Sequence, residues 1–326
     1  MPELPEVEYT ARQLRSSVIG AEISDIQVFW ERIIGHPGAA DFMAEVAGKR
    51  ITGVRRRGKF LLIDLAPSSN PEIAAATDFL SIHRRMTGNL LLLPPGWEID
   101  TSLRESDAAA WNARGPTFIP PDPLSLCASN GRMIRTSDTA YCRVCFTFSD
   151  GRRLIYTDLR KFGRVECWPL ERETEVFADL GAEPLSSDFT AEALANALAR
   201  RKTSIKQALL DQTVVAGLGN IYADEALFAA RIHPLRRADS LTPPESAALH
   251  NSIIAVLARS IEHGGTSFSN YRNLWGEAGE NYSHVRVYQQ DGKPCIRCGT
   301  LIERSVIAQR SAHFCPVCQT LAVTVG

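Results

Sequence analysis

The sequence predicts an α+β protein with more than one domain: an N-terminal helix with a β-sandwich, a helical domain and a cysteine-stapled hairpin. Four observations predict this order. Helical apolar spacing opens the chain, short apolar runs typical of strands continue to about residue 168, and helical spacing returns after Gly181. Two Cys-x-x-Cys pairs lie near the C-terminal end. We therefore divide the chain into residues 1–168, a linker at 169–184, and the segments 185–285 and 286–326.

The first helix is expected over residues 5–19, where Val7, Ala11, Leu14 and Val18 form one apolar stripe and Gly20 is a plausible stop. Short apolar or alternating runs then predict the strands of the sandwich, at Ile51–Val54, Phe60–Leu65, Leu80–Leu93 and Tyr141–Phe148. Two stretches rich in Pro, Ser, Asn, Asp and Ala interrupt them and read as loops or insertions, at 66–79 and 94–140.

Length and composition set the class of protein. A chain of 326 residues has room for two domains with cores of their own, and 44% hydrophobic with 22% charged residues is ordinary for a globular protein. The sequence contains no secretory signal and no apolar run near the roughly 18 residues of a membrane span. We expect a cytoplasmic monomer, in which eight cysteines favour metal binding or free thiols over disulfides.

Charge is unevenly distributed along the chain. The net charge of −1 excludes a uniformly basic nucleic-acid coat, yet six of the eleven residues from Lys49 to Lys59 are basic, while acidic residues gather at 166–183. Such polarity allows one face to bind a polyanion. A solvated charged loop is the equally simple alternative.

The N-terminus has the pattern of an amine nucleophile. Removal of Met1 before the small Pro2 would leave a secondary amine beside Glu3 at the positive end of the first helix, which lowers the amine pKa. An α-amino group already has a pKa of only about 7.7–8.0. Attack of this amine on a sugar aldehyde carbon would give a cationic iminium. The plain alternative is a proline at a helix start.

Cys295-x2-Cys298-x16-Cys315-x2-Cys318 has zinc-ribbon spacing, and four thiolates around one Zn²⁺ leave no open position for a catalytic water. We therefore predict a structural zinc. Arg310 is expected near the tip of the hairpin between the pairs, as a phosphate or groove contact.

A second Cys-x-x-Cys pair, Cys142 and Cys145, falls on a predicted strand. We expect its side chains to point to opposite faces and therefore not to chelate an ion.

Three further segments suggest contacts with a polymer. Asn220, after Gly217-Leu-Gly219, suits a helix N-cap whose free N–H groups could bind phosphate. Met86 and Phe162 stand among arginines and glycines at strand ends, so they read either as core residues or as apolar wedges that replace an extruded base. The polar loop after Gly264-Gly265-Thr266, up to His284, is a candidate lid.

Together and in this order, these motifs resemble the formamidopyrimidine-DNA glycosylase family, bacterial enzymes that excise oxidised purines. The resemblance covers almost the whole chain. Its motifs are Pro2–Glu8, Arg57-Gly-Lys59-Phe, His83-x-x-Met86, Asp158–Gly163, Gly217–Asn220, Gly264-Gly-Thr and the cysteine hairpin. It implies a helix–two-turn–helix domain at 185–285, a zinc finger at 286–326, and 8-oxoguanine glycosylase with AP lyase activity by β,δ-elimination. The implied partner is duplex DNA with oxidised bases or abasic sites.

The resemblance also implies roles for single residues. The catalytic set is Pro2 as nucleophile at the sugar C1′, Glu3 as its acid/base partner, Lys59 as a strand lysine near the phosphate of the lesion, and Arg310 as a phosphate ligand. The DNA contacts are His83, Met86, Arg160, Phe162, Lys206 and Asn220. Within that set, Met86, Arg160 and Phe162 fill the void and pair with the orphaned cytosine, while Ser267–His284 covers the flipped base.

Two departures stand out: Leu159 replaces a usual proline, and His313 stands where hydroxyl or aromatic residues are common, with little expected to depend on it. Two rival functions remain open. One is an endonuclease VIII-like glycosylase for oxidised pyrimidines, which Leu4 and the Gly-Gly-Thr motif disfavour. The other is a non-catalytic zinc-ribbon DNA-binding protein, which would not need Pro2, Glu3 and Lys59.

Overall fold

The structure is a computed structural model that describes residues 2–68, 75–96, 125–127, 133–135, 141–268 and 270–321. Contacts within the chain divide it into two compact units. The first unit contains Pro2, Glu6–Val176 and Gly264–Glu280, and the second contains Glu3–Pro5, Phe177–His263 and the residues from Asn281 onward. Residues 264–280, placed by sequence in the helical segment 185–285, therefore group with the strands.

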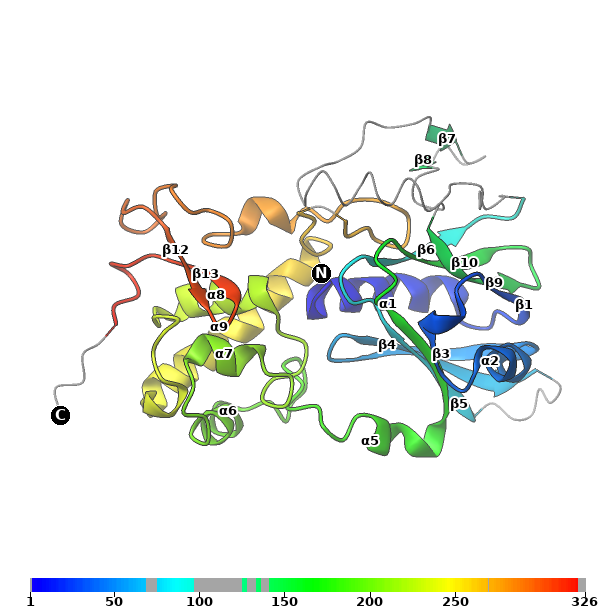
Figure 1. The fold of residues 1–326 in the computed structure, drawn as a ribbon, viewed down its shortest axis with the longest axis horizontal. Helices are drawn as coiled ribbons and strands as arrows, with labels where there is room; N and C mark the ends of the chain where they lie inside the picture. Colours follow the sequence, from blue (N-terminus) through cyan, green and yellow to red (C-terminus); the bar gives the residue numbers. More distant parts are fainter. Residues whose placement is uncertain are drawn as a thin grey trace. The chain divides into compact units, whose positions relative to one another are not determined.

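The first unit is built on two sheets and helix α1 (Figure 1). The helices of this part are α1 (Leu4–Val18), α2 (Ala39–Val46) and α5 (Glu173–Val176). Its strands are β1 (Ile23–Val28), β2 (Ile34–His36), β3 (Lys49–Arg57), β4 (Phe60–Pro67), β5 (Asp78–His83), β6 (Gly88–Leu93), β7 (Ser125–Cys127), β8 (Met133–Arg135), β9 (Cys142–Phe148), β10 (Arg153–Asp158) and β11 (Arg164–Pro169). One sheet has the order β1-β9-β10-β6 and the other β2-β11-β5-β4-β3, and β7 and β8 form a two-stranded sheet among the described residues.

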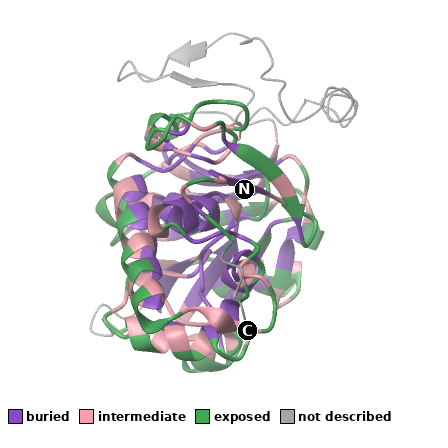
Figure 2. Cartoon of the chain, turned by 90° about the vertical axis from the view of Figure 1, so that its left-hand side faces the viewer, coloured by how far each residue is buried: buried purple, intermediate pink, exposed green. Residues whose placement is uncertain are grey.

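The core of this unit lies between the two sheets. The apolar stripe of α1 packs there with side chains of both sheets, such as Leu92 and Phe146 from one and Ile63 and Ile82 from the other. Buried residues are purple in Figure 2. The predicted helix and its stop are confirmed: α1 ends at Val18, and Gly20 adopts a φ of +85° that favours glycine.

The expected run Leu80–Leu93 is two strands. The chain leaves β5 at His83, turns through residues 84–87 and enters β6 at Gly88, whose N–H donates to the carbonyl of Arg84 over 3.0 Å. Arg85 has a φ of +51° in this turn. The polar residues 83–85 and Gly88 separate two apolar runs here, so the sequence does contain the signal of this turn.

The expectation that Cys142 and Cys145 point to opposite faces is wrong. Both lie in one small buried cluster with Leu91, Leu93 and Ile155. The register of β10 against β9 shifts between Tyr156, opposite Val144, and Thr157, opposite Cys142. This irregularity skips Arg143 and cancels one step of the strand's alternation, so both thiols reach the same face.

The second unit is mainly helical. Its helices are α6 (Ala191–Leu198), α7 (Ile205–Leu210), α8 (Asn220–Ala230) and α9 (Pro243–Glu262), and its hairpin is β12 (Glu303–Ile307) with β13 (Arg310–Phe314). Short 3-10 helices occur in both units, at Glu31–Ile33, Leu170–Arg172, Ala238–Ser240 and Asn281–His284. Helix α9 begins with a capping box in which Thr242 and Glu245 satisfy each other's backbone N–H groups.

Most of the two expected insertions, at 66–79 and 94–140, falls outside the described residues. Among the helices that are described, none combines the length and the apolar character needed to cross a membrane.

Candidate functional site

Glu3 is fixed by the first turn of α8. It is 2% exposed, and its carboxylate accepts the N–H of Ile221 over 3.0 Å and that of Tyr222 over 3.4 Å. The N-cap of α8 is Gly219, where a Cβ would lie 2.3 Å from Cδ of Glu3. The expected N-cap role of Asn220 is therefore wrong: Asn220 is the first residue inside the helix, and the free N–H groups bind a carboxylate of the same chain.

Leu4, the residue after Glu3, is also bound to the segment that precedes α8. The N–H of Leu4 donates to the carbonyl of Gly217 over 3.1 Å. Gly217 has a φ of +95°, and a Cβ on it would lie 2.6 Å from Cδ1 of Leu4. The Gly217-Leu-Gly219 motif thus lets the backbone before α8 approach the N-terminal segment closely. Pro2, which directly precedes Glu3, is buried.

Lys59 and His83 lie close together in the first unit. Lys59 occupies the turn before β4 rather than a strand, and it is 8% exposed. His83 ends β5 opposite Phe60. Burial, with the charges of Arg85 and Lys59, lowers the pKa of His83 to about 3. The N–H of Arg85 donates to Nδ1 of His83 over 3.1 Å, which assigns the proton of the neutral ring to Nε2.

The expected wedge residues are exposed rather than part of the core. Phe162 is 53% exposed and Met86 is 37% exposed. Arg160 is also exposed, and its guanidinium lies 4.7 Å from the centre of the Phe162 ring. Apolar side chains of this size are usually buried, so their exposure on neighbouring turns indicates a contact surface.

Asp158 connects the turn that carries Met86 to the loop that carries Arg160 and Phe162. Its carboxylate is completely buried and accepts the hydroxyl of Thr87, next to Met86, in a short hydrogen bond. It also accepts the N–H of Arg160 over 3.2 Å and that of Gly163 over 2.8 Å. One carboxylate therefore fixes the turn of Met86 relative to the loop of Arg160 and Phe162.

Several basic side chains of the cluster at 49–59 form ion pairs with carboxylates of the protein itself. Arg55 lies 2.6 Å from Asp64 and 2.7 Å from Glu173, and Arg56 lies 3.0 Å from Glu8. Lys49 pairs with Asp78. These three cations are balanced by carboxylates, which weakens the cluster as a polyanion-binding face.

Lys206 is completely buried, although we expected it to contact DNA. Its Nζ lies 2.5 Å from Oδ1 of Asp224 and donates to the carbonyl of Asn220 over 3.1 Å. Burial lowers the pKa of Lys206, and Asp224 opposes that shift. The structure thus gives Lys206 a role in supporting α8, because its ammonium does not reach the surface.

His313 also belongs to this network, against the expectation that little depends on it. It is 3% exposed, and both its backbone N–H and its Nδ1 lie 3.0 Å from Oδ2 of Asp224. Asn220 donates from Nδ2 to the hydroxyl of Ser311 over 3.3 Å. Through these bonds the first turns of α8 are joined to β13, the strand that begins with Arg310.

Arg310 lies at the hairpin tip, as expected. The turn residues Ala308 and Gln309 have φ values of +46° and +62°, and Arg310 is exposed directly after them. It lines a cavity of about 470 Å³ together with residues of α7 and the segment before it, including Arg201 and Gln207. Arg201 pairs with Asp211, which lines the same cavity, over 3.1 Å, so Arg310 is the better candidate there for a phosphate contact.

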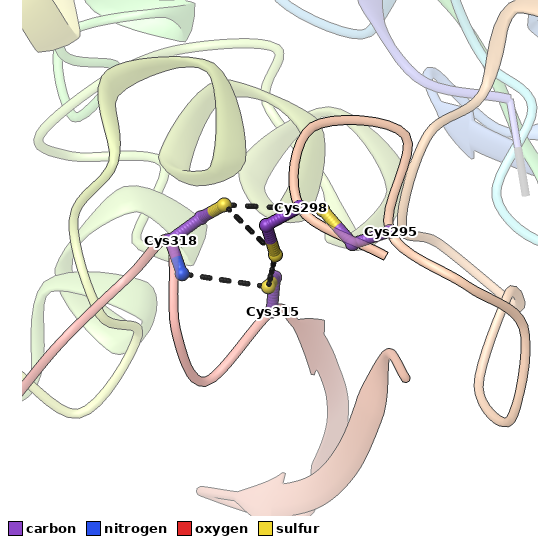
Figure 3. Close-up of side chains that lie close together, drawn as sticks. All are labelled: Cys295, Cys298, Cys315 and Cys318. Atoms are coloured by element: carbon purple, nitrogen blue, oxygen red, sulfur yellow. Dashed lines mark hydrogen bonds between the residues drawn. The ribbon is translucent and has the colours of Figure 1, made fainter. Parts of the chain in front are cut away.

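The four cysteines of the C-terminal array converge (Figure 3). Their sulfur atoms all lie within 4.8 Å of one another, and the Sγ atoms of Cys298 and Cys315 are 3.5 Å apart. Tetrahedral zinc with bonds of about 2.3 Å needs sulfurs about 3.8 Å apart. The backbone N–H groups of Arg297 and Cys318 donate to Cys295 and Cys315 over 3.4 Å. The array fits one structural zinc, which confirms the prediction.

The segment expected as a lid is partly packed into the first unit. Tyr271 is 5% exposed and Leu274 is completely buried. At its start, the N–H of Thr266 donates to the carboxylate of Glu6 over 2.8 Å. Gly265 has a φ of +86°, and a Cβ there would lie 2.9 Å from Cγ of Glu6. The start of the segment is therefore anchored to α1.

Sequence reasoning missed Glu6, Asp158, Asp224 and His313 as members of these networks. Three of them stand inside motifs that the sequence displays, but a motif does not tell which of its polar residues turns inward. Residue type was the available signal. A charged side chain inside an apolar stretch is rarely buried without a partner, so each such residue predicts one.

Three domain families match most of the chain. The formamidopyrimidine-DNA glycosylase N-terminal domain matches residues 1–165, its H2TH domain matches 180–272, and a zinc finger found in FPG and IleRS matches 292–321. The formamidopyrimidine-DNA glycosylase of Symbiobacterium thermophilum is 41% identical, with 98% of this chain and 89% of the relative covered. That of Herpetosiphon aurantiacus is 40% identical over 98% and 100%.

Solved structures give the same result. Lactococcus lactis Fpg in complex with DNA that contains an abasic site has a TM-score of 0.77 and 31% identity, covering 98% of this chain and 99% of that one. A complex of the same protein with a Fapy-dG containing DNA has a TM-score of 0.75 and 31% identity, with 98% and 100% covered.

Proposed function

Because the chain belongs to the formamidopyrimidine-DNA glycosylase family, we propose that it excises oxidised purines, such as 8-oxoguanine and formamidopyrimidines, from duplex DNA. The amine of Pro2, freed of Met1, attacks the sugar C1′ and displaces the base. The resulting iminium acidifies the C2′ proton, and β- and then δ-elimination cut the strand on both sides. The products are the free base, a gap with phosphates at both ends, and the unsaturated sugar aldehyde, which is released when water hydrolyses its iminium bond to Pro2.

The observation that carries this proposal is the fixed carboxylate of Glu3. It directly follows Pro2 in the chain and binds two N–H groups at the start of α8. A carboxylate held in this way cannot swing to solvent, so it stays available to move protons on the opening sugar. A plain DNA-binding module needs no such arrangement beside its N-terminus.

The exposed turns supply what base extrusion requires. Removing a base from the stack costs a few kcal/mol, and apolar wedges offset that cost by filling the vacancy. Met86 and Phe162 are exposed side chains that suit this role, and Arg160 stands beside Phe162 to bond the orphaned cytosine. These roles are proposals supported by exposure and by the shared Asp158 anchor.

We assign the phosphate contacts to side chains that can donate a hydrogen bond to a phosphate oxygen. The neutral ring of His83 has its proton on Nε2, and Arg310 stands exposed at the hairpin tip. Asn220 and Lys59 are further proposed ligands on the two units. Zinc supplies no chemistry to the reaction, because four cysteines fill its coordination sphere; it holds the hairpin that carries Arg310.

The class of lesion is the finer part of the proposal. Solved complexes of Lactococcus lactis Fpg contain Fapy-dG or an oxidised pyrimidine. The Fapy-dG complex supports purine substrates for this chain. The complex with an oxidised pyrimidine supports the alternative, a glycosylase for oxidised pyrimidines. A comparison of both lesions in the same sequence context decides between them.

Borohydride trapping tests the mechanism. Wild-type protein incubated with a duplex containing 8-oxoguanine opposite cytosine should form a covalent adduct, and Pro2→Gly should form much less of it, because its primary amine can still form an imine but lacks the proline ring. Glu3→Gln should reduce excision of the base. Mass spectrometry must first show that Met1 is absent. If protein without Met1 forms no adduct and cuts neither a purine nor a pyrimidine lesion, the proposal is wrong and a DNA-binding module is the better interpretation.

A further inference from the structure

The first unit contains a buried arginine that the proposed mechanism does not use. Arg84 begins the turn that carries Met86, yet it is only 1% exposed and is among the largest fully buried side chains of the described chain. Burying a guanidinium is costly unless its N–H groups are satisfied. Its contacts therefore reveal what the position requires.

Arg84 first closes its own turn. Its Nε donates to the carbonyl of Gly88 over 2.9 Å, while its own carbonyl accepts the N–H of Gly88 over 3.0 Å. A second nitrogen donates to the hydroxyl of Thr10 on α1 over 2.9 Å. The turn of Met86 is thus attached to the N-terminal helix through one planar group.

The remaining contacts of Arg84 reach the segment 270–274. Its third nitrogen donates to the carbonyl of Arg272 over 3.2 Å and to Oδ1 of Asn89 over 2.9 Å. The ring of Tyr271 lies 5.2 Å from its guanidinium carbon. Three nitrogens of one planar group thus reach four acceptors, and lysine could not replace them because all of its donors lie on one atom.

Asn89 completes the connection. Its Oδ1 also accepts the N–H of Arg272 over 3.0 Å, and its Nδ2 donates to the carbonyl of Asn270 over 2.8 Å. Arg84 and Asn89 therefore fix the backbone of residues 270–272 relative to the turn of Met86. All of these residues lie in one compact unit.

We propose that Arg84 is a positioning residue that sets the segment 270–272 against the Met86 turn, so that reading of the damaged base depends on a group that never touches it. The inference rests on the proposed function, in which this segment belongs to the loop over the flipped base. An abasic site offers no base to read. The turn itself keeps the backbone bond between Arg84 and Gly88, so loss of the side chain should spare chemistry on the sugar.

The test compares two substrates under single-turnover conditions. Arg84→Met should slow excision of 8-oxoguanine by about tenfold to a hundredfold, the scale expected of a displacement of about 1 Å. Cleavage of the same duplex with a preformed abasic site should change by less than about threefold. Asn89→Ala should show the same selective loss. Thr10→Ser, which keeps the hydroxyl that accepts from Arg84 and removes only a methyl group, is the matched control and should leave the ratio of the two rates unchanged.

A second measurement needs no activity. Releasing the segment should speed tryptic cleavage after Arg272 in the folded protein, while cleavage after the exposed Lys202 serves as the internal reference. Equal loss on both substrates, or unchanged cleavage after Arg272 in both Arg84→Met and Asn89→Ala, overturns the inference. A wild-type protein inactive on both substrates refutes the proposed function instead.

A double-mutant cycle separates coupling from independent damage. If Arg84 and Asn89 act as one unit, the Arg84→Met/Asn89→Ala protein should excise 8-oxoguanine about as slowly as Arg84→Met alone. If the fold losses of the two single variants instead multiply in the double variant, the two side chains support the segment independently. That result contradicts the role assigned to Arg84.

Discussion

Nζ of Lys206 lies 2.5 Å from Oδ1 of Asp224, and both side chains are completely removed from solvent. The other oxygen of Asp224 accepts the backbone N–H of His313 over 3.0 Å. One buried carboxylate therefore connects α7, α8 and β13. The hairpin that carries Arg310 depends on this carboxylate for its position on the helical unit.

Lys206→Met should destabilise the protein by about 3–5 kcal/mol, because it leaves the charge of Asp224 buried without its cation. Urea unfolding followed by circular dichroism measures the change. The double variant Lys206→Met/Asp224→Asn should recover part of the loss, since no charge then remains buried. Lys202→Met, at an exposed lysine of the same unit, is the control, and an equal effect of the two single variants would contradict the role of burial.

His83 should make stability depend on pH. Its folded pKa of about 3 lies below the unfolded value of about 6.5. Between these values the unfolded chain binds a proton that the folded chain does not, so this contribution is complete above about pH 6.5 and is lost as pH falls toward 3.

His83→Asn keeps an acceptor for the N–H of Arg85 and removes the titrating ring. Its free energy of unfolding should fall less steeply than that of the wild type between about pH 6.5 and pH 4. Urea titrations at several pH values measure both slopes, with values near pH 8 as the common reference. Parallel curves for the two proteins would show that His83 is protonated in the folded state.

Phe162→Ala should reduce base excision by about tenfold or more with little change in stability, because the exposed ring fills a vacancy only in the complex. The ring is 53% exposed, so its removal creates no cavity in the free protein. Phe29→Ala, at a phenylalanine that is 41% exposed in the same unit, is the matched control. Equal activity of both variants would remove Phe162 from the DNA interface.

The elements that the sequence predicted well are those with a local cause. The apolar stripe of α1 and the glycine after it are visible within twenty residues, and the spacing of four cysteines defines a metal site without any knowledge of the fold. Exposure of Met86 and Phe162 was left open, since residue type alone favours burial.

The elements that the sequence could not supply depend on long-range contacts. The carboxylate of Glu3 caps a helix 218 residues away, which displaced Asn220 from its expected N-cap. Lys206 looked like a surface cation because its partner, Asp224, is 18 residues away on another helix. Cys142 changed faces through one register shift against a strand that follows it. Such features need the positions of partners, and local patterns do not contain them.

Loss of zinc should displace the hairpin of β12 and β13 and leave the fold of the first unit unchanged. Cys298→Ser removes one of four thiolates whose sulfurs lie within 4.8 Å. Bound zinc, measured by mass spectrometry of the metal, should fall from one per chain toward zero, and affinity for an abasic-site duplex should fall about tenfold or more, or about 1.4 kcal/mol. The physical reason is that Cys315 directly follows β13, so the metal and the bonds of Asp224 to His313 together hold the strand that begins with Arg310.

Cys142→Ser is the matched control, because it alters a buried thiol of the first unit that is not one of the four cysteines of the array. It should keep one zinc per chain. A chelator added to wild type should reproduce the binding defect of Cys298→Ser, and added zinc should reverse it. Full DNA affinity in zinc-free protein would mean that the buried bonds between Asp224 and His313 hold β13 without the metal, and the hairpin would then depend on those bonds alone.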